Sequence, residues 1–246
     1  MNKRKAKKIL QRFCSFDISS SADVLKAFAA LPSAISFFDG GKNNFVYVPG
    51  KREDRVLLVA HADTVWDSFY TGQTFEQTLR RRIGGYSGTN PLCGIGADDR
   101  AGCAILWLLK DSGHSLLVVD GEEHGQIGSN HIFMHYPEIF DEINRHSYII
   151  QFDRRQHKNY KVYRLPVTEQ FRKFIEKSTG YTDSGKTART DIVILCRDIC
   201  GVNLSIGYYN EHTSRERIVF NHWFKTVILT EKMLRYPQNR FPLSEE

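Results

Sequence analysis

The residues best suited to chemistry follow a short apolar segment in the first third of the chain. Residues 56–60 are all apolar, and His61 and Asp63 come directly after them with one residue in between. Such a run is long enough for a buried β-strand, and alternate side chains of an extended chain point the same way. A metal-binding histidine commonly donates its second ring N–H to a carboxylate, which orients the ring. The spacing therefore predicts a histidine ligand with an orienting aspartate, although a single His-x-Asp pair is also typical of a structural histidine.

Carboxylates or a histidine lie next to regular elements in four later segments. Asp98 and Asp99 occupy a glycine-rich turn ahead of a predicted helix over 101–110, and Asp99 has the position of a helix N-cap. The others each follow an apolar, strand-like segment, and they are Glu122 and Glu123, Asp153, and His212. Neighbouring residues at a strand end point in different directions, so one glutamate can hold a metal while the other faces a substrate.

The segments that carry these residues alternate between strand and helix patterns. Strands are predicted over residues 35–38, 44–48, 56–60, 116–120, 148–152, 192–195 and 202–206, and helices over 22–28, 101–110, 130–135, 137–143, 167–178 and 214–236. This order predicts an α/β fold, a three-layer α/β/α sandwich with a mixed, mostly parallel central sheet. Sites in such sheets lie beyond the carboxyl ends of the strands. The residues predicted to lie there are His61, Glu122, Glu123, Asp153 and His212.

Two histidines and three carboxylates from separate segments suit a two-metal site with mixed nitrogen and oxygen ligands. Zinc prefers this mixture, and cobalt or manganese can take its place. Two metals of this kind lie about 3.5–4 Å apart and act together on one substrate. The sequence therefore predicts a site that needs a further carboxylate to bridge the two ions.

The order of these segments resembles the two-zinc exopeptidase superfamily, which includes peptidase T, the glutamate carboxypeptidases and the two-zinc leucyl aminopeptidases. The family pattern is His-x-Asp after a strand, Gly-x-Asp-Asp-Lys-x-Gly, Glu-Glu-x-Gly-x-x-Gly-Ser, a strand-end Asp and a late His. This chain has His61-Ala62-Asp63, Gly96-Ala97-Asp98-Asp99-Arg100-Ala101-Gly102, Glu122-Glu123-His124-Gly125-Gln126-Ile127-Gly128-Ser129, Asp153 and His212. All five segments occur in the family's order, over residues 56–216.

The resemblance implies a role for each matching ligand. His61 and Asp153 would bind one zinc ion, and Glu123 and His212 would bind the other. Asp98 would bridge both ions, and many members have a cis peptide bond after this residue. A water bridging the two zinc ions would attack the scissile carbonyl.

The resemblance also implies two catalytic roles beyond metal binding. Asp63 would orient His61, and Glu122 would be the general base that takes a proton from the water and delivers one to the leaving amine. Arg100 stands where many relatives have lysine, and it is a candidate for substrate binding. The other substrate-binding candidates are Arg189, in a polar loop, and Tyr208, Tyr209 and Asn210, which either line the substrate site or pack their loop on the sheet.

Many relatives carry an inserted lid or dimerisation domain between the last two motifs. The segment 154–211 already contains a predicted helix and about two strands, so no separate domain fits there. The chain is therefore expected to be a single catalytic domain over residues 1–246, with a site open to solvent.

Composition and charge narrow the class of protein. Hydrophobic residues make up 41% and charged residues 25% of the 246 residues, as in ordinary globular proteins, and no apolar run reaches the roughly 18–20 residues of a membrane span. The N-terminus lacks the apolar region of a secretory signal, and five cysteines without a C-x-x-C pair fit reduced thiols in a cytoplasmic protein. Most of the net charge of +6 lies in a predicted basic helix over residues 1–15. A solvated helix end is favoured there over a nucleic-acid contact.

These features predict a metal-dependent exopeptidase, most simply a cytoplasmic aminopeptidase that acts on short peptides. An amidohydrolase that removes an acyl group from a small N-acyl substrate, or a carboxypeptidase, would use the same chemistry. An inactive binding protein is the alternative from a different class, and it is disfavoured because every expected ligand and the base are present. The sequence leaves open the side-chain preference, the physiological metal and the oligomeric state.

Overall fold

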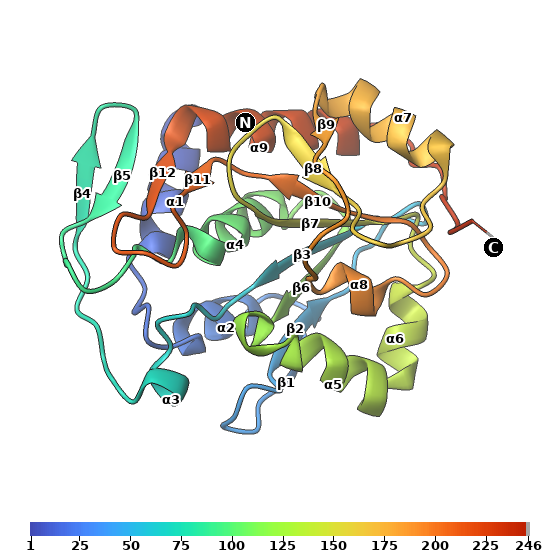
Figure 1. Ribbon diagram of the computed structural model, residues 1–246. Coiled ribbons are helices and arrows are strands. Elements are labelled where there is room, and N and C mark those ends of the chain that lie inside the picture. Colours follow the sequence, from blue (N-terminus) through green and yellow to red (C-terminus); the bar gives the residue numbers. More distant parts are fainter. Residues whose placement is uncertain (245–246) are drawn as a thin grey trace.

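A mixed sheet of eight strands forms the centre of the computed structural model, which describes residues 1–244 (Figure 1). In spatial order the strands are β1 (Ile35–Phe37), β2 (Phe45–Val48), β6 (Ser115–Val119), β3 (Leu57–His61), β7 (Ile149–Arg154), β10 (Gly201–Ser205), β8 (Asn159–Lys161) and β9 (Thr182–Asp183). Strands β6, β3, β7 and β10 are parallel, whereas β1, β2 and β8 run antiparallel to their inner neighbours. The predicted mixed sheet with a parallel centre is confirmed.

Helices cover both faces of this sheet (Figure 1). On one face α4 (Ala97–Leu109) packs on β3 and β7, and against α4 pack α1 (Lys3–Cys14), α2 (Ala22–Ala29) and α9 (Phe220–Leu234). On the other face α8 (Ile192–Leu195) packs on β7 and β10, next to α5 (Ile127–His135), which contacts α6 (Pro137–Ile143). Helix α7 (Glu169–Thr179) lies against α9. These layers form the predicted α/β/α sandwich.

The central strands are apolar on both sides because helices cover each face. Residues 57–60 of β3 and 116–119 of β6 are buried, the pattern of a parallel sheet between two helical layers. His61 is paired in register with Val119, so β3 and β6 end side by side. The polar residues that follow these two strands are therefore neighbours.

A smaller antiparallel sheet carries the loop that contains His212. Its strands, in spatial order, are β11 (Tyr208–Tyr209), β12 (Arg217–Val219), β5 (Gly85–Gly88) and β4 (Leu79–Arg82). A Cβ on Gly85 would lie 1.9 Å from the carbonyl oxygen of Ile218, so the close approach of β5 to β12 requires glycine. The short helix α3 (Ser68–Thr71) lies in the segment before this sheet.

Two predicted elements differ from the structure. Residues 192–195 form helix α8 rather than a strand, because a short apolar run does not distinguish a buried strand from a buried helical turn. The turn closes locally on the carbonyl of Asp191, with N···O distances of 2.9 Å. The helix predicted over 214–236 begins only at Phe220, because Arg217–Val219 pairs with β5 and β11 instead.

The basic N-terminal segment forms the predicted helix. The side chain of Asn2 caps α1 by accepting the backbone N–H groups of Arg4 and Lys5, which would otherwise lack partners. Leu10 and Phe13 are buried on its inner face. The helix is amphipathic, so its charged residues lie on the solvent side.

Two expectations from composition can be compared with the structure. All five cysteines are buried and none forms a disulfide. Within residues 1–244, every helix is too short or too polar to cross a membrane.

A buried histidine links the stability of the fold to pH. Burial, with repulsion from Arg55, lowers the pKa of His146 from its ordinary value of 6.5 to about 4. The Oγ of Ser115 lies 2.7 Å from Nε2, and the carbonyl oxygen of Ile143 lies 2.9 Å from Nδ1. This arrangement suits a neutral ring that donates from Nδ1 and accepts at Nε2.

We expect the free energy of unfolding to decrease as the pH falls from about 6.5 towards about 4. In that range the unfolded chain binds a proton that the folded His146 does not, so protonation favours unfolding. His146 alone should lower the free energy of unfolding by about 2 kcal/mol between pH 7 and pH 5, measured by urea unfolding. His146→Asn keeps a donor near the Ile143 carbonyl but does not titrate. An equal pH dependence in the variant and the wild type would assign the effect to other groups.

Candidate metal centre

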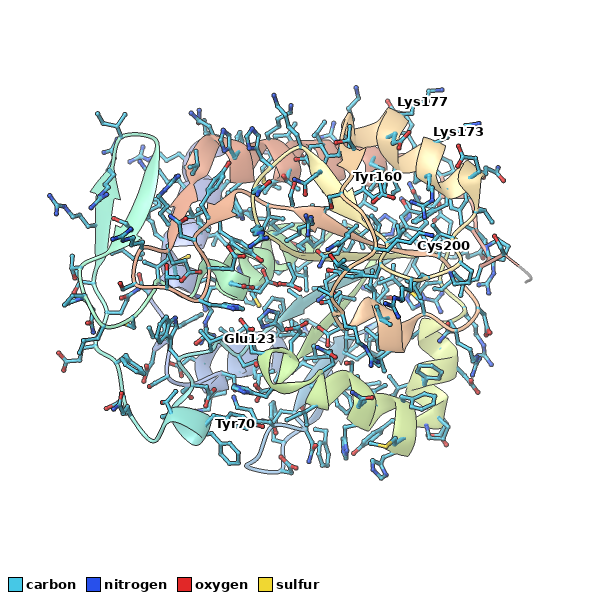
Figure 2. All side chains as sticks on the ribbon, viewed as in Figure 1. Tyr70, Glu123, Tyr160, Lys173, Lys177 and Cys200 are labelled. Carbon is cyan, nitrogen blue, oxygen red and sulfur yellow. The ribbon has the colours of Figure 1, made fainter. Side chains whose placement is uncertain are left out.

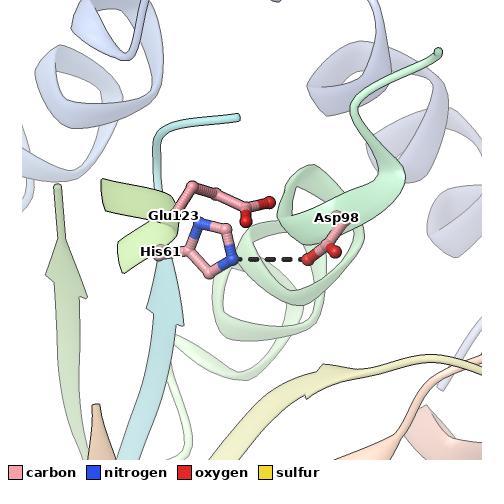
Figure 3. Close-up of side chains that lie close together, drawn as sticks. All are labelled: His61, Asp98 and Glu123. Carbon is pink, nitrogen blue, oxygen red and sulfur yellow. Dashed lines mark ion pairs between the residues drawn. The ribbon is translucent and has the colours of Figure 1, made fainter. Parts of the chain in front are cut away.

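The predicted metal ligands come together at the carboxyl ends of the parallel strands. His61 ends β3, Asp153 lies in β7, and Glu123 lies in the 3-10 turn η1 (Glu122–His124) after β6. Asp98 lies in the non-helical turn at the start of α4, and His212 in the loop between β11 and β12. Figure 3 shows the side chains of His61, Asp98 and Glu123 gathered at one place. Elements far apart in the chain thus contribute to a single cluster.

The carboxylate of Asp98 lies between the two histidines. Its Oδ1 is 3.3 Å from Nε2 of His61, and its Oδ2 is 3.2 Å from Nε2 of His212. Oδ1 of Asp153 lies 3.4 Å from Nε2 of His61, and Oε1 of Glu123 lies 2.8 Å from Nε2 of His212. These contacts divide the cluster into two halves that share Asp98, in the arrangement that the resemblance implies.

The donors and their spacing fit a divalent metal. Ligands at tetrahedral positions around zinc, with bonds of about 2.0–2.2 Å, lie about 3.4 Å from one another. The separations of 3.2, 3.3 and 3.4 Å between the histidine nitrogens and the aspartate oxygens match this spacing. Both ring nitrogens of His61 and Oδ1 of Asp98 are buried without an aligned hydrogen bond within the described residues. Buried polar atoms seldom lack partners, and metal ligation would satisfy Nε2 of His61 and Oδ1 of Asp98.

Asp63 supports both the histidine and the two glutamates. Its Oδ1 lies 3.2 Å from Nδ1 of His61. Its two oxygens accept the backbone N–H groups of Glu122 at 3.1 Å and Glu123 at 3.2 Å. Burial raises the pKa of Asp63, but the close contact with His61 and its positive charge outweigh burial and hold that pKa at about 2. Asp63 therefore fixes the ring of His61 and the turn that presents the glutamates.

The crowding of carboxylates sets the electrostatics of the cluster. Hydrogen bonds to Asp98 and Glu123 raise the pKa of His212 to about 11. Burial, reinforced by the charge of Asp98, raises the pKa of Glu123 to about 7. Burial and the charge of Asp153 raise the pKa of Glu122 well above its ordinary value of 4.5. The buried carboxylates of the cluster repel one another, and bound cations would relieve this repulsion.

The cluster opens into a cavity of about 440 Å³. This volume lies within the range of about 300–1,000 Å³ that is typical of small-molecule sites. Glu122 lines the cavity together with the ligands and is 8% exposed. Its Oε1 lies 3.5 Å from Nε2 of Gln126. Glu122 thus faces the space beside the metal ligands.

Asp98 and Asp99 have separate roles although they are neighbours. Oδ1 of Asp99 accepts the N–H of Gly102 at 2.9 Å, as an N-cap does, and Oδ2 accepts the N–H of His61 at 3.3 Å. Donor atoms of His61, Asp99 and Asp153 also lie within 4.8 Å of one another. Both oxygens of Asp99 are already engaged by backbone groups, however, so we assign it to the cap. The peptide bond between Asp98 and Asp99 is cis, as the resemblance implies.

Glu216 supports the cluster, and sequence reasoning did not identify this role. It is 1% exposed. Its Oε2 accepts the N–H groups of Ile95 at 2.7 Å and Gly96 at 2.8 Å, and its Oε1 accepts the N–H of Asp98 at 3.0 Å. The carboxylate therefore holds the turn that presents Asp98. Its partners lie more than a hundred positions earlier in the chain, so no local pattern could reveal the contact.

Glu216→Gln should weaken metal binding about 10- to 100-fold although no ligand is removed. The amide NH₂ group would face backbone N–H groups that need acceptors, and the turn around Asp98 would shift. Titration of the metal-free protein with zinc against a competing chelator measures the effect. Glu211→Gln is the control, because Glu211 pairs with Arg155. Equal zinc affinity in wild type and Glu216→Gln would show that the turn does not depend on Glu216.

The substrate-binding candidates lie in different places. Arg189 and Tyr208 line the cavity, and the hydroxyl of Tyr208 lies 3.4 Å from Oδ1 of Asp153. The hydroxyl of Tyr209 instead hydrogen-bonds two histidines, and the amide of Asn210 donates within its own loop. Neither Tyr209 nor Asn210 is among the described residues that line the cavity.

Arg100 does not reach the cavity. It is fully buried, and its Nη2 donates to the carbonyl oxygens of Asp17 at 3.0 Å and Ser20 at 2.8 Å. The side chain therefore connects α4 with the segment between α1 and α2. This placement corrects the expectation of a substrate contact, because the helix directs Arg100 towards the N-terminal layer.

The cavity is also lined by cationic residues that sequence reasoning did not identify. They are Arg154, Arg155 and Lys161. The two arginines directly follow Asp153, a position that could have drawn attention to them. Lys161 belongs to β8 and carries no motif, and only the pairing of β8 with β10 brings it to the cavity.

Comparisons with known proteins give a match in structure alone. No protein-family model and no curated sequence matches the chain. Aminopeptidase PepT from Bacillus cereus ATCC 10987 has a TM-score of 0.66 at 14% identity, with 95% of this chain and 98% of that chain covered. A tripeptidase from Staphylococcus aureus has a TM-score of 0.67 at 13% identity, covering 96% and 100%. A glutaminyl cyclase from an Acidobacteriales bacterium has a TM-score of 0.61 at 15% identity, covering 95% and 94%. The chain therefore has the fold shared by this aminopeptidase, this tripeptidase and this glutaminyl cyclase.

Proposed function

We propose that the protein is a metal-dependent exopeptidase, specifically an aminopeptidase that hydrolyses short peptides. The observation that carries the proposal is the pair of histidines joined through Asp98, each with a further carboxylate of its own. Glu122 lies in the same cavity. The shared fold of an aminopeptidase and a tripeptidase supports it.

In this proposal the two halves of the cluster hold two zinc ions. His61 and Asp153 hold one, Glu123 and His212 hold the other, and Asp98 is shared. When bound, such metals supply a water of lowered pKa and polarise the scissile carbonyl, and cobalt or manganese can do the same. Asp63 and the turn around Asp98 would hold the ligands in place.

Glu122 is proposed to move the proton. Its backbone is fixed by Asp63, and its carboxyl group faces the cavity beside the ligands. Burial raises the pKa of Glu122, and a base whose pKa is nearer neutrality both accepts and returns a proton efficiently. Glu122 would take a proton from the water that attacks the peptide carbonyl and pass it to the amine that leaves.

We also propose that one domain performs the whole reaction. The segment between Asp153 and His212 forms β8, α7, β9, α8, β10 and β11, and β8, β9 and β10 belong to the central sheet. Substrate contacts would then come from residues of the cavity such as Tyr208 and Arg189.

A panel of fluorogenic substrates tests the proposal. Aminoacyl, N-acyl and C-terminal substrates are assayed with protein loaded with zinc, cobalt or manganese, and metal content is measured in parallel. We expect turnover of aminoacyl substrates. Faster turnover of N-acyl or C-terminal substrates would replace the aminopeptidase by a deacylase or a carboxypeptidase. No turnover of any substrate by metal-loaded protein would favour a binding protein.

A further inference from the structure

A largely buried lysine that has no counter-ion within residues 1–244 faces the same cavity. Lys161 is 6% exposed, and its Nζ donates to the hydroxyl of Thr187 at 3.2 Å. Among residues 1–244 no carboxylate lies within ion-pair distance of it, and the carboxylate of Asp183 is engaged by Arg172. Buried charges in proteins are normally paired, because removing an ion from water is costly. The environment of Lys161 is therefore incomplete without an anion.

The residues around Lys161 add positive charge rather than neutralise it. Arg154 donates from Nε to the amide oxygen of Asn159 at 2.6 Å and forms no ion pair in the described chain. Arg189 is exposed at the rim of the cavity, likewise without an ion pair within residues 1–244. Burial, together with repulsion from Arg154 and Arg155, lowers the pKa of Lys161. The cavity is thus lined both by the acidic residues of the cluster and by cationic residues.

A rigid route connects Lys161 to the metal cluster. Lys161 pairs across the sheet with Asn203 of β10, and the amide of Asn203 lies 3.3 Å from Oδ2 of Asp153 and 2.9 Å from the hydroxyl of Tyr163. The ammonium lies 5.4 Å from the centre of the Tyr163 ring. β8 is two strand spacings from β7, or about 10 Å, and a peptide residue spans about 3.3–3.6 Å. The long side chain of Lys161 takes up part of this separation, which leaves room for one or two substrate residues between its ammonium and the cluster.

We propose that Lys161, with Arg154 and Arg189 at the rim, binds a substrate carboxylate one or two residues from the scissile bond. This inference rests on the proposed peptidase function of the neighbouring cluster. The carboxylate has two sources with the same chemistry, the free C-terminus of a short peptide or an acidic side chain. A carboxylate would complete the environment of Lys161 by accepting the N–H donors that Thr187 leaves free.

Paired substrates separate the two sources. Trialanine is compared with trialanine amide, and Ala-Glu-Ala amide with Ala-Gln-Ala amide, so each pair differs by one negative charge. We expect wild-type kcat/KM to be about 10- to 100-fold higher for the charged member of one pair, the gain expected for a hydrogen bond to a charged group. Preference in the first pair identifies the C-terminus, and preference in the second identifies the side chain. Hydrolysis without preference in either pair would overturn the inference while the peptidase proposal stands.

Substitution of Lys161 assigns the preference to this residue. Lys161→Met removes the charge and keeps the length of the side chain, so it should lower kcat/KM for the charged substrate about 10- to 100-fold and leave the neutral one unchanged. Lys161→Arg should retain part of the preference. The control is Lys173→Met on α7, an exposed lysine away from the cluster around Glu123 (Figure 2). A preference that survives in Lys161→Met would overturn the assignment.

A binding measurement keeps the inference separate from the peptidase proposal. If no peptide is hydrolysed, the peptidase proposal fails, and calorimetric titration of the metal-free protein with trialanine, Ala-Glu-Ala amide and their neutral counterparts decides the role of Lys161. Tighter binding of a charged peptide to wild type than to Lys161→Met supports it. Equal affinity for charged and neutral peptides contradicts it. Lys161→Met should unfold at the same temperature as wild type or higher, because a buried unpaired charge is removed.

Discussion

Glutamine in place of Glu122 should lower kcat by about 100- to 10,000-fold, the range expected for loss of a general base. The amide has the shape of the carboxyl group but cannot take up a proton. Asp98, Asp153 and Glu123 lie close to Nε2 of a histidine, whereas Glu122 does not. Both metal ions should therefore remain bound in the variant. Turnover per bound metal, with metal content from mass spectrometry, measures the effect.

Glu211→Gln is the matched control for this experiment. Glu211 lines the same cavity, but its carboxylate is paired with Arg155 at 2.6 Å, so its loss should change kcat little. Unchanged kcat in Glu122→Gln with both metals bound would exclude Glu122 as the base. Loss of metal from Glu122→Gln would place it among the ligands instead.

Asp98→Asn should lower metal affinity by more than about 100-fold and abolish turnover. Loss of a residue that only supports a ligand costs about 10- to 100-fold, and Asp98 is proposed to be the ligand shared by both halves of the cluster. An amide has one acceptor oxygen and cannot contact two cations as a carboxylate does. Zinc titration of the metal-free protein gives the affinity and the number of ions bound.

The neighbouring Asp99→Asn provides a sharp control, because it makes the same chemical change one residue away. Asparagine caps a helix about as well as aspartate, so the variant should keep the cap of α4, although its amide NH₂ would face the backbone N–H of His61 that Oδ2 of Asp99 accepts. Asp99→Asn should therefore weaken zinc binding far less than Asp98→Asn does. Loss of zinc from Asp99→Asn, with binding retained in Asp98→Asn, would exchange the roles of the two residues.

The gathering of the proposed ligands could be predicted because each of them belongs to a short local pattern. His61 and Asp63 come at the end of a short continuous apolar run, and such a run is recognisable from its own residues. The parallel order of the central strands then brings their carboxyl ends together. That β3 and β6 end side by side could be predicted once their two apolar segments were assigned as strands.

Whether other segments form a strand or a helix depends on contacts with residues outside the segment. Arg217–Val219 fits a helical pattern, but pairing with β5 and β11 makes it a strand. The apolar run 192–195 forms a helical turn because it packs against β7 and β10. Local preferences are small, so tertiary contacts override them in short segments.

The sequence by itself determined the α/β architecture and the residues gathered around Asp98, since periodicity and motif order are properties of the chain alone. Only the tertiary structure decided that Glu216 holds the turn of Asp98, that Arg100 turns away from the cavity, and that Lys161 faces it without a counter-ion. The physical reason is that burial and pairing of a charge depend on groups far apart in the chain. Their meeting depends on the packing of whole elements, which no local pattern records.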